Sequence, residues 1–178
     1  MPLEIEAKIK VDTLDPVAQR LSELGARFIA EQAQSDAYFL DAEGKLARAG
    51  SGLRLRAETA DDKTVAILTF KGPRKPGPYK TRPEYETAVA DPKAMLRILE
   101  GLGFRSCLTV VKTRRLWELD GCLVCLDAVP PLGCFVEVEG PGDDAIKAVL
   151  TRLHLADRPH ITDGYAAMMA RHRTGEPQ

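Results

Sequence analysis

Carboxylates and basic side chains recur at every second position along several segments of the sequence. Glu4, Glu6 and Lys8 alternate with apolar residues near the start. Successive side chains of a β-strand point to opposite faces, so such a strand carries one charged and one apolar face. The same spacing gives Arg54 and Arg56, then Arg82, Glu84 and Glu86, then Lys112 and Arg114, and finally Glu137 and Glu139, while Lys71 and Asp127 stand singly on their segments.

These residue types suit one kind of ligand. Arginine forks and lysine ammonium groups bind phosphate oxygens, and pairs of glutamates offer the hard oxygen ligands that Mg²⁺ or Mn²⁺ takes beside a phosphate. Six of these basic residues indicate several phosphate groups: Lys8, Arg54, Arg56, Lys71, Lys112 and Arg114. For a single strand, the simpler interpretation is a solvated outer face.

Eight segments have the alternation typical of strands, and four have the apolar spacing of helices. The predicted strands are 3–11, 35–40, 52–59, 65–71, 82–90, 108–119, 122–129 and 134–139. The predicted helices are 15–25, 91–102, one from about 143 and one from about 163. Asp15-Pro16 and Asp91-Pro92 each predict an N-cap followed by proline, and Asp120-Gly121 predicts a tight hairpin.

The order strand, helix and three strands occurs twice, which indicates an internal duplication. Two four-stranded halves could close as one barrel, although a two-sheet sandwich stays open. The helices need the apolar sheet face to pack on, so the charged set is expected to face the barrel axis. The predicted fold class is α+β, a closed eight-stranded antiparallel β-barrel with flanking helices.

Composition excludes several classes of protein. With 25 basic and 26 acidic residues the formal net charge is −1, which argues against a nucleic-acid-binding surface. The sequence has neither a signal-peptide pattern nor an apolar run that could span a membrane, so we expect a cytoplasmic protein. Cys122 and Cys125 have the spacing of a zinc or redox pair, but a second ligand pair is missing and buried thiols are the better interpretation.

The sequence resembles the CYTH family, also called triphosphate tunnel metalloenzymes. Glu4-Ile5-Glu6-Ala7-Lys8 is similar to the family's E-x-E-x-K signature. Further similar blocks follow in order: Gln34 to Phe39, Leu53 to Arg56, Thr69 to Pro73, Arg82 to Glu86, Lys112 to Arg114, Asp127, and Gly133 to Glu139. The resemblance runs from residue 4 to about 170, and implies an eight-stranded tunnel and a single CYTH-like domain over 1–178.

The resemblance also implies roles for particular residues. Expected metal ligands for Mg²⁺ or Mn²⁺ are Glu4, Glu6, Asp127, Glu137 and Glu139. Expected substrate-binding residues are Lys8, Arg54, Arg56, Lys71, Arg82, Lys112 and Arg114, and the expected catalytic residues are Lys8, Lys71, Tyr38 and Arg114. Lys75 or Lys80 could replace Arg82, and the roles of Glu84 and Glu86 stay open. Gly164-Tyr165 stands where the family often has Ser-Tyr, which leaves closure of the tunnel by the last helix open.

The resemblance implies a small-molecule triphosphate as partner, with a class IV adenylyl cyclase as the first hypothesis for the reaction. Such an enzyme converts ATP to cyclic AMP and pyrophosphate. A thiamine triphosphatase or inorganic triphosphatase is the alternative, since Tyr38 and Lys71 match residues that assist the attacking water in thiamine triphosphatases. A non-catalytic polyphosphate- or nucleotide-binding module is the third. No nucleic acid or membrane is expected as a partner, and a homodimer stays open.

Overall fold

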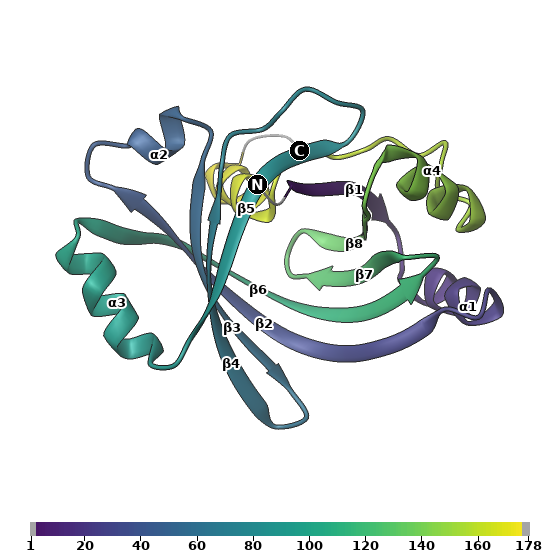
Figure 1. The fold of residues 1–178 in the computed structure, drawn as a ribbon, viewed down its shortest axis with the longest axis horizontal. Coiled ribbons are helices and arrows are strands. Elements are labelled where there is room, and N and C mark those ends of the chain that lie inside the picture. The colour runs from purple at the N-terminus through teal and green to yellow at the C-terminus, as the bar shows by residue number, and fades with distance from the viewer. Residues whose placement is uncertain (1–2, 176–178) are drawn as a thin grey trace.

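Eight antiparallel strands close into a barrel in the computed structural model, which describes residues 3–175 (Figure 1). The strands are β1 (Leu3–Val11), β2 (Arg27–Asp41), β3 (Gly52–Ala60), β4 (Lys63–Lys71), β5 (Lys80–Val89), β6 (Phe104–Leu119), β7 (Cys122–Val129) and β8 (Gly133–Glu139). Around the barrel their order is β1-β5-β4-β3-β2-β6-β7-β8. The predicted closed barrel is confirmed, and the two-sheet alternative is wrong.

Five helices accompany the strands: α1 (Asp15–Glu23), α2 (Lys45–Arg48), α3 (Pro92–Gly101), α4 (Asp143–Arg152) and α5 (Tyr165–Thr174). The short α2 was not predicted. The Asp91 side chain accepts a hydrogen bond from the Ala94 N–H and caps α3 as predicted. The Asp15 cap is wrong, because Asp15 is the first residue of α1 and the N-cap position before it is Leu14, which has no side-chain cap. No helix among these residues is long and apolar enough to cross a membrane.

The strand order supports the internal duplication. Each of the first four strands has a counterpart four strands later, and exchanging the two sets leaves every neighbour in the barrel unchanged. The two Asp-Pro pairs mark equivalent points, since α1 follows β1 and α3 follows β5. The halves meet where β1 pairs with β5 and where β2 pairs with β6.

Strand β2 is much longer than the predicted segment 35–40. It pairs with β6 from Arg27 to Asp41, and a register shift between Phe28 and Ala30 interrupts the pairing. Such a shift breaks the two-residue alternation from which strands are predicted. The Asp120-Gly121 hairpin is confirmed, because both residues have positive φ, 50° and 76°, as a two-residue turn between antiparallel strands favours.

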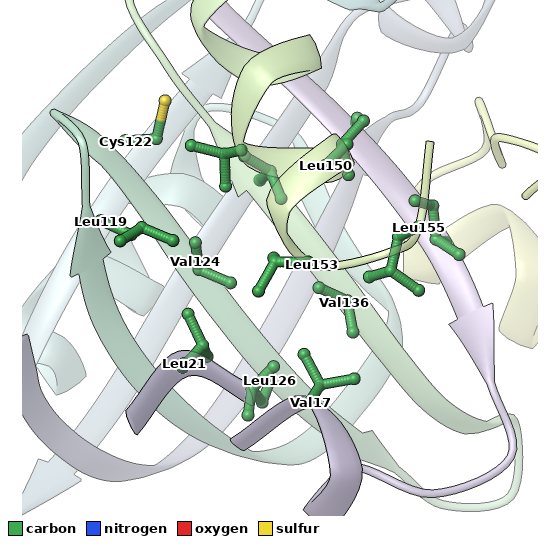
Figure 2. Packing of buried hydrophobic residues seen from close by; sticks show 14 of the residues in the cluster. Val17, Leu21, Leu119, Cys122, Val124, Leu126, Val136, Leu150, Leu153 and Leu155 are labelled. Carbon is green, nitrogen blue, oxygen red and sulfur yellow. The ribbon is translucent and has the colours of Figure 1, made fainter. Parts of the chain in front are cut away.

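Helices α1 and α4 cover the outer, apolar face of β1, β6, β7 and β8. Figure 2 shows Val17 and Leu21 of α1 and Leu150 of α4 pointing toward Val124 and Val136 on the sheet. Helix α3 covers the opposite part of the barrel, where Leu99 packs with side chains of β2 and β3. These helices pack on the apolar faces of the strands, so the alternate, charged side chains of the same strands face the lumen.

Leu21 anchors α1 to the barrel and is fully buried. Leu21→Ala is expected to lower the free energy of unfolding by roughly 2–5 kcal/mol, because it removes packed methyl groups and leaves a cavity. Leu102→Ala is the matched control, since Leu102 is 69% exposed just after α3, and we expect a change within about 0.5 kcal/mol. Urea denaturation measures both, and equal losses would contradict this account of the core.

Candidate functional site

The barrel encloses a cavity of about 710 Å³. All the predicted site residues except Asp127 line it: Glu4, Glu6, Lys8, Tyr38, Arg54, Arg56, Lys71, Arg82, Lys112, Arg114, Glu137 and Glu139. The charged strand faces therefore point inward, which confirms that part of the prediction. A cavity of this size matches ligand pockets of roughly 300–1,000 Å³.

Asp127 lies just behind the lining and is completely buried. Its carboxylate accepts hydrogen bonds from Lys112 (3.0 Å), from Arg114 (two, each 2.6 Å) and from the Tyr165 hydroxyl (2.8 Å). Burial raises the pKa of Asp127, but Arg114 and Lys112 outweigh it and the pKa is lowered. Both oxygens are thus occupied by donors, which favours a role in positioning Lys112 and Arg114 over the expected metal ligation.

Asp36 holds a second pair of basic side chains and was not predicted as a site residue. It accepts hydrogen bonds from Arg56 Nε (2.7 Å) and Nη2 (2.9 Å), and Arg54 Nη1 lies 3.6 Å away. Burial raises the pKa of Asp36, yet the Arg56 hydrogen bond and the Arg54 charge lower it overall. Its position two residues before Tyr38, on the same face of the strand, could have identified it from the sequence as a lumen residue.

Arg54 has an unused donor in this arrangement. Its Nη2 donates to Thr69 Oγ1 (3.0 Å) and to Glu86 Oε1 (3.2 Å). Its Nε is buried without a hydrogen-bond partner among the residues that the structure describes. An unpaired buried donor is unfavourable, so an acceptor oxygen from a ligand in the cavity would stabilise it.

Lys71 joins two carboxyl groups at another part of the lumen. Its Nζ lies 2.8 Å from Glu4 Oε1 and 2.7 Å from Glu84 Oε2. Burial raises the pKa of Glu4, but Lys71 outweighs it and brings that pKa to about 2. Burial and the neighbouring Glu4 carboxylate raise the pKa of Glu84 to about 8. A carboxyl group with this pKa is mostly protonated at neutral pH.

Lys80 reaches deeper into the lumen than Arg82, which was the predicted substrate-binding residue. The Lys80 ammonium is buried and bonds to Glu6 inside the lumen. Arg82 instead donates to the backbone carbonyls of Gly72 (2.8 and 2.9 Å) and Gly50 (2.8 Å) at the edge of the cavity. The alternation along β5 puts both residues on the inner face, so the sequence could not decide between them.

Three of the five predicted metal ligands lie where β1 pairs with β8: Glu6, Glu137 and Glu139. Glu6 lies opposite Glu139 and Lys8 lies opposite Glu137 in the register. Lys8 Nζ is 3.1 Å from Glu137 Oε1, and Arg114 also binds Glu137. Burial and the negative charges of Glu4 and Glu6 raise the pKa of Glu139 to about 7. Carboxylates crowded in this way attract cations.

The donor set at this place fits Mg²⁺ or Mn²⁺, which prefer carboxylate oxygens. Within residues 3–175, no group of three or more acidic, histidine or cysteine side chains already has the arrangement of a metal site. The carboxylates are turned toward lysines instead: Lys71 pairs with Glu4, Lys80 with Glu6 and Lys8 with Glu137. A divalent cation would compete with these ammonium groups for the same oxygens.

Helix α5 closes the cavity on one side through Tyr165. Its ring lies 4.0 Å from Lys8 Nζ and 4.7 Å from Lys112 Nζ, so both ammonium groups face the aromatic ring. The same ring packs against Phe135 and neighbouring apolar residues. Tyr165 thus packs against apolar residues and contacts the lumen lysines, and α5 closes the cavity, which the sequence left open.

Tyr38 faces the lumen beside the arginines, directly across from Arg54 in the sheet. Burial and the Asp36 charge raise its pKa. A phenol with a raised pKa stays protonated at neutral pH, so Tyr38 can donate a hydrogen bond but is a poor base.

The cysteine interpretation is confirmed. Cys122 and Cys125 are free and buried. Cys122 belongs to the apolar cluster under α1 and α4, whereas Cys125 lines the lumen. Being on opposite faces of β7, they cannot share a metal ion. Burial raises the pKa of Cys125 to about 12, which makes it an inert thiol.

Comparison with known proteins adds independent findings. The model of the CYTH domain matches residues 2–156. A protein of Methanocaldococcus jannaschii, named "Putative adenylate cyclase MJ0240", is 31% identical over 137 residues, which are 77% of this chain and 76% of the relative.

Solved structures have the same fold. The PH1819 protein of Pyrococcus horikoshii is similar with a TM-score of 0.85 and 25% identity, covering 96% of this chain and 99% of that one. The protein HpAC1 of Hippeastrum has a TM-score of 0.70 and 20% identity, covering 100% and 98%.

The raised pKa of Glu84 predicts how stability depends on pH. The folded protein holds this proton up to about pH 8, whereas the carboxyl ordinarily titrates at 4.5. The free energy of unfolding should therefore fall as pH rises from 4.5 to 8, because the folded state binds more protons there. Glu84→Gln should flatten this slope in urea denaturation, and Glu31→Gln, an exposed control, should not. An unchanged slope in Glu84→Gln would refute the raised pKa of Glu84.

Proposed function

Because the chain belongs to the CYTH domain family, we propose that it is a divalent-metal-dependent enzyme that acts on a triphosphate in the barrel lumen. The proposed reaction is that of a class IV adenylyl cyclase, which forms cyclic AMP and pyrophosphate from ATP. The relative from Methanocaldococcus jannaschii is named "Putative adenylate cyclase MJ0240" and supports this choice.

The observation that carries the proposal is the pairing of basic side chains by buried acids inside a cavity. Asp36 fixes Arg54 and Arg56, and Asp127 fixes Lys112 and Arg114. Arg54 Nε remains a buried donor without a partner among the described residues. Donors held in place before a ligand arrives stabilise developing phosphate charge without reorganisation, and phosphoryl transfer depends mainly on such stabilisation.

Each part of the lumen then has a role. Arg54, Arg56, Lys112 and Arg114 would bind the phosphate oxygens, and Lys8 would hold Glu137 and a neighbouring phosphate. Glu4, Glu6, Glu137 and Glu139 would hold Mg²⁺ or Mn²⁺, which neutralises phosphate charge and lowers the pKa of an attacking hydroxyl. Tyr165 and α5 exclude water from the side where Lys8 and Lys112 lie.

A triphosphatase is the second candidate. The Hippeastrum protein is named a "putative adenylyl cyclase" and is reported to have a dominant triphosphatase activity. In this chain Tyr38 and Lys71 both line the lumen, where they could orient a water molecule toward the terminal phosphate. The raised pKa of Tyr38 limits it to donating a hydrogen bond.

Product analysis separates the two reactions. Purified protein is incubated with ATP, thiamine triphosphate or inorganic triphosphate and either Mg²⁺ or Mn²⁺, and the products are resolved by chromatography. We expect cyclic AMP and pyrophosphate from ATP, and no product in EDTA. Phosphate released chiefly from the other two substrates would replace the cyclase with a triphosphatase.

The control is an Arg54→Gln variant prepared in the same way. Removing this donor should lower the rate by about 10²–10³, as is typical for a residue that stabilises transition-state charge. An activity that persists undiminished in Arg54→Gln would come from a contaminant or from another site, and would refute the proposal.

A further inference from the structure

Arg74 is a basic residue at the edge of the lumen that neither the sequence nor the family resemblance singled out. It lies in segment 72–79, which connects β4 to β5, and it lines the cavity. Its Nη2 is 3.4 Å from Asp163 Oδ1, just before α5. This contact is long and exposed, and an ion pair of that kind is weak.

Asp163 does not depend on Arg74 for a partner. Arg171 Nη2 lies 2.6 Å from Asp163 Oδ2, at hydrogen-bonding distance. If the Arg74 guanidinium moved away, the Asp163 carboxylate would remain paired with Arg171. Moving the guanidinium to another acceptor therefore costs little free energy.

Two contacts hold the backbone of segment 72–79 on either side of the loop that follows Arg74. The Lys75 N–H donates to the Thr81 carbonyl at 2.7 Å, and the Tyr79 ring stacks on His160 with centroids 5.2 Å apart. Rotation of the Arg74 side chain is therefore enough to bring its guanidinium toward the cavity.

A second guanidinium group lies at this edge. Arg82 also lines it, and among the described residues its hydrogen bonds go to the carbonyls of Gly50 and Gly72 without an ion pair. Burial lowers the pKa of Arg82 and Arg74 adds to this change, whereas the carboxylates of Glu4, Glu6 and Glu84 oppose it. Two guanidinium groups on the cavity lining, neither held by a strong ion pair, can both donate to a phosphate group.

We propose that Arg74 is a substrate-binding residue that exchanges Asp163 for a phosphate group of the triphosphate at the edge of the lumen, beside Arg82. This inference rests on the proposed function. It gives segment 72–79 a specific task, which is to add a movable guanidinium to the fixed basic side chains of the strands. Asp163 holds that guanidinium near the cavity and releases it to the substrate.

Calorimetric titration with inorganic triphosphate in EDTA tests the exchange without turnover. Arg74→Gln should weaken binding about tenfold, the usual loss for one charge-assisted hydrogen bond. Lys75→Gln is the matched control, because it removes an exposed charge from the same segment without a place in the cavity lining. Its affinity should change less than about twofold. Asp163→Asn should leave binding unchanged or make it tighter.

The outcomes separate three explanations. If Asp163→Asn weakens binding as much as Arg74→Gln does, the Arg74–Asp163 pair only anchors the segment and the proposal is wrong. If Lys75→Gln and Arg74→Gln weaken triphosphate binding equally, the effect comes from the net charge of the segment. That result would also overturn the proposal. If the unmodified protein binds triphosphate neither in EDTA nor with Mg²⁺, the proposed function itself fails. Thermal denaturation of each variant verifies that the fold is unchanged.

Discussion

Charged side chains inside a closed barrel must each find a partner, because an unpaired buried charge is far less stable than one in water. This constraint explains the arrangement of the lumen. Asp127 meets two basic residues and the Tyr165 hydroxyl, and Asp36 meets two arginines. The acids leave their basic partners oriented into the cavity. The same network that makes the lumen stable therefore prepares it for an anion.

The glutamates follow the same constraint with the signs reversed. Lysines from β4, β5 and β1 hold Glu4, Glu6 and Glu137. Glu84 keeps its proton because burial and the Glu4 carboxylate disfavour a second negative charge. A triphosphate with a divalent cation can take over both sets of contacts, since the phosphates bind the lysines and the cation binds the carboxylates. Helix packing outside the barrel explains this arrangement. The helices cover the apolar faces of the strands, so the charged faces point into the lumen.

Much of this could be predicted because a strand alternates with a period of two. That periodicity predicts that Glu4, Glu6 and Lys8 face the lumen. It predicts the same for Arg54 and Arg56. It could not predict β2 before residue 35, where the register shift near Ala30 breaks the alternation. Nor could it choose between Lys80 and Arg82, or show that Asp127 faces three donors, since these depend on contacts between strands and with α5. The Arg74–Asp163 pair spans 89 positions and has no local signal.

The central claim is that the β1 and β8 carboxylates hold a divalent cation next to bound triphosphate. Electron paramagnetic resonance of Mn²⁺ with inorganic triphosphate measures this directly, with the Glu6→Gln, Glu139→Gln double variant for comparison. The account predicts a protein-bound Mn²⁺ signal with phosphorus couplings in the unmodified protein, and its loss in the double variant while triphosphate binding persists. The same bound signal in both proteins would contradict the claim, because the cation would then be held without these carboxylates.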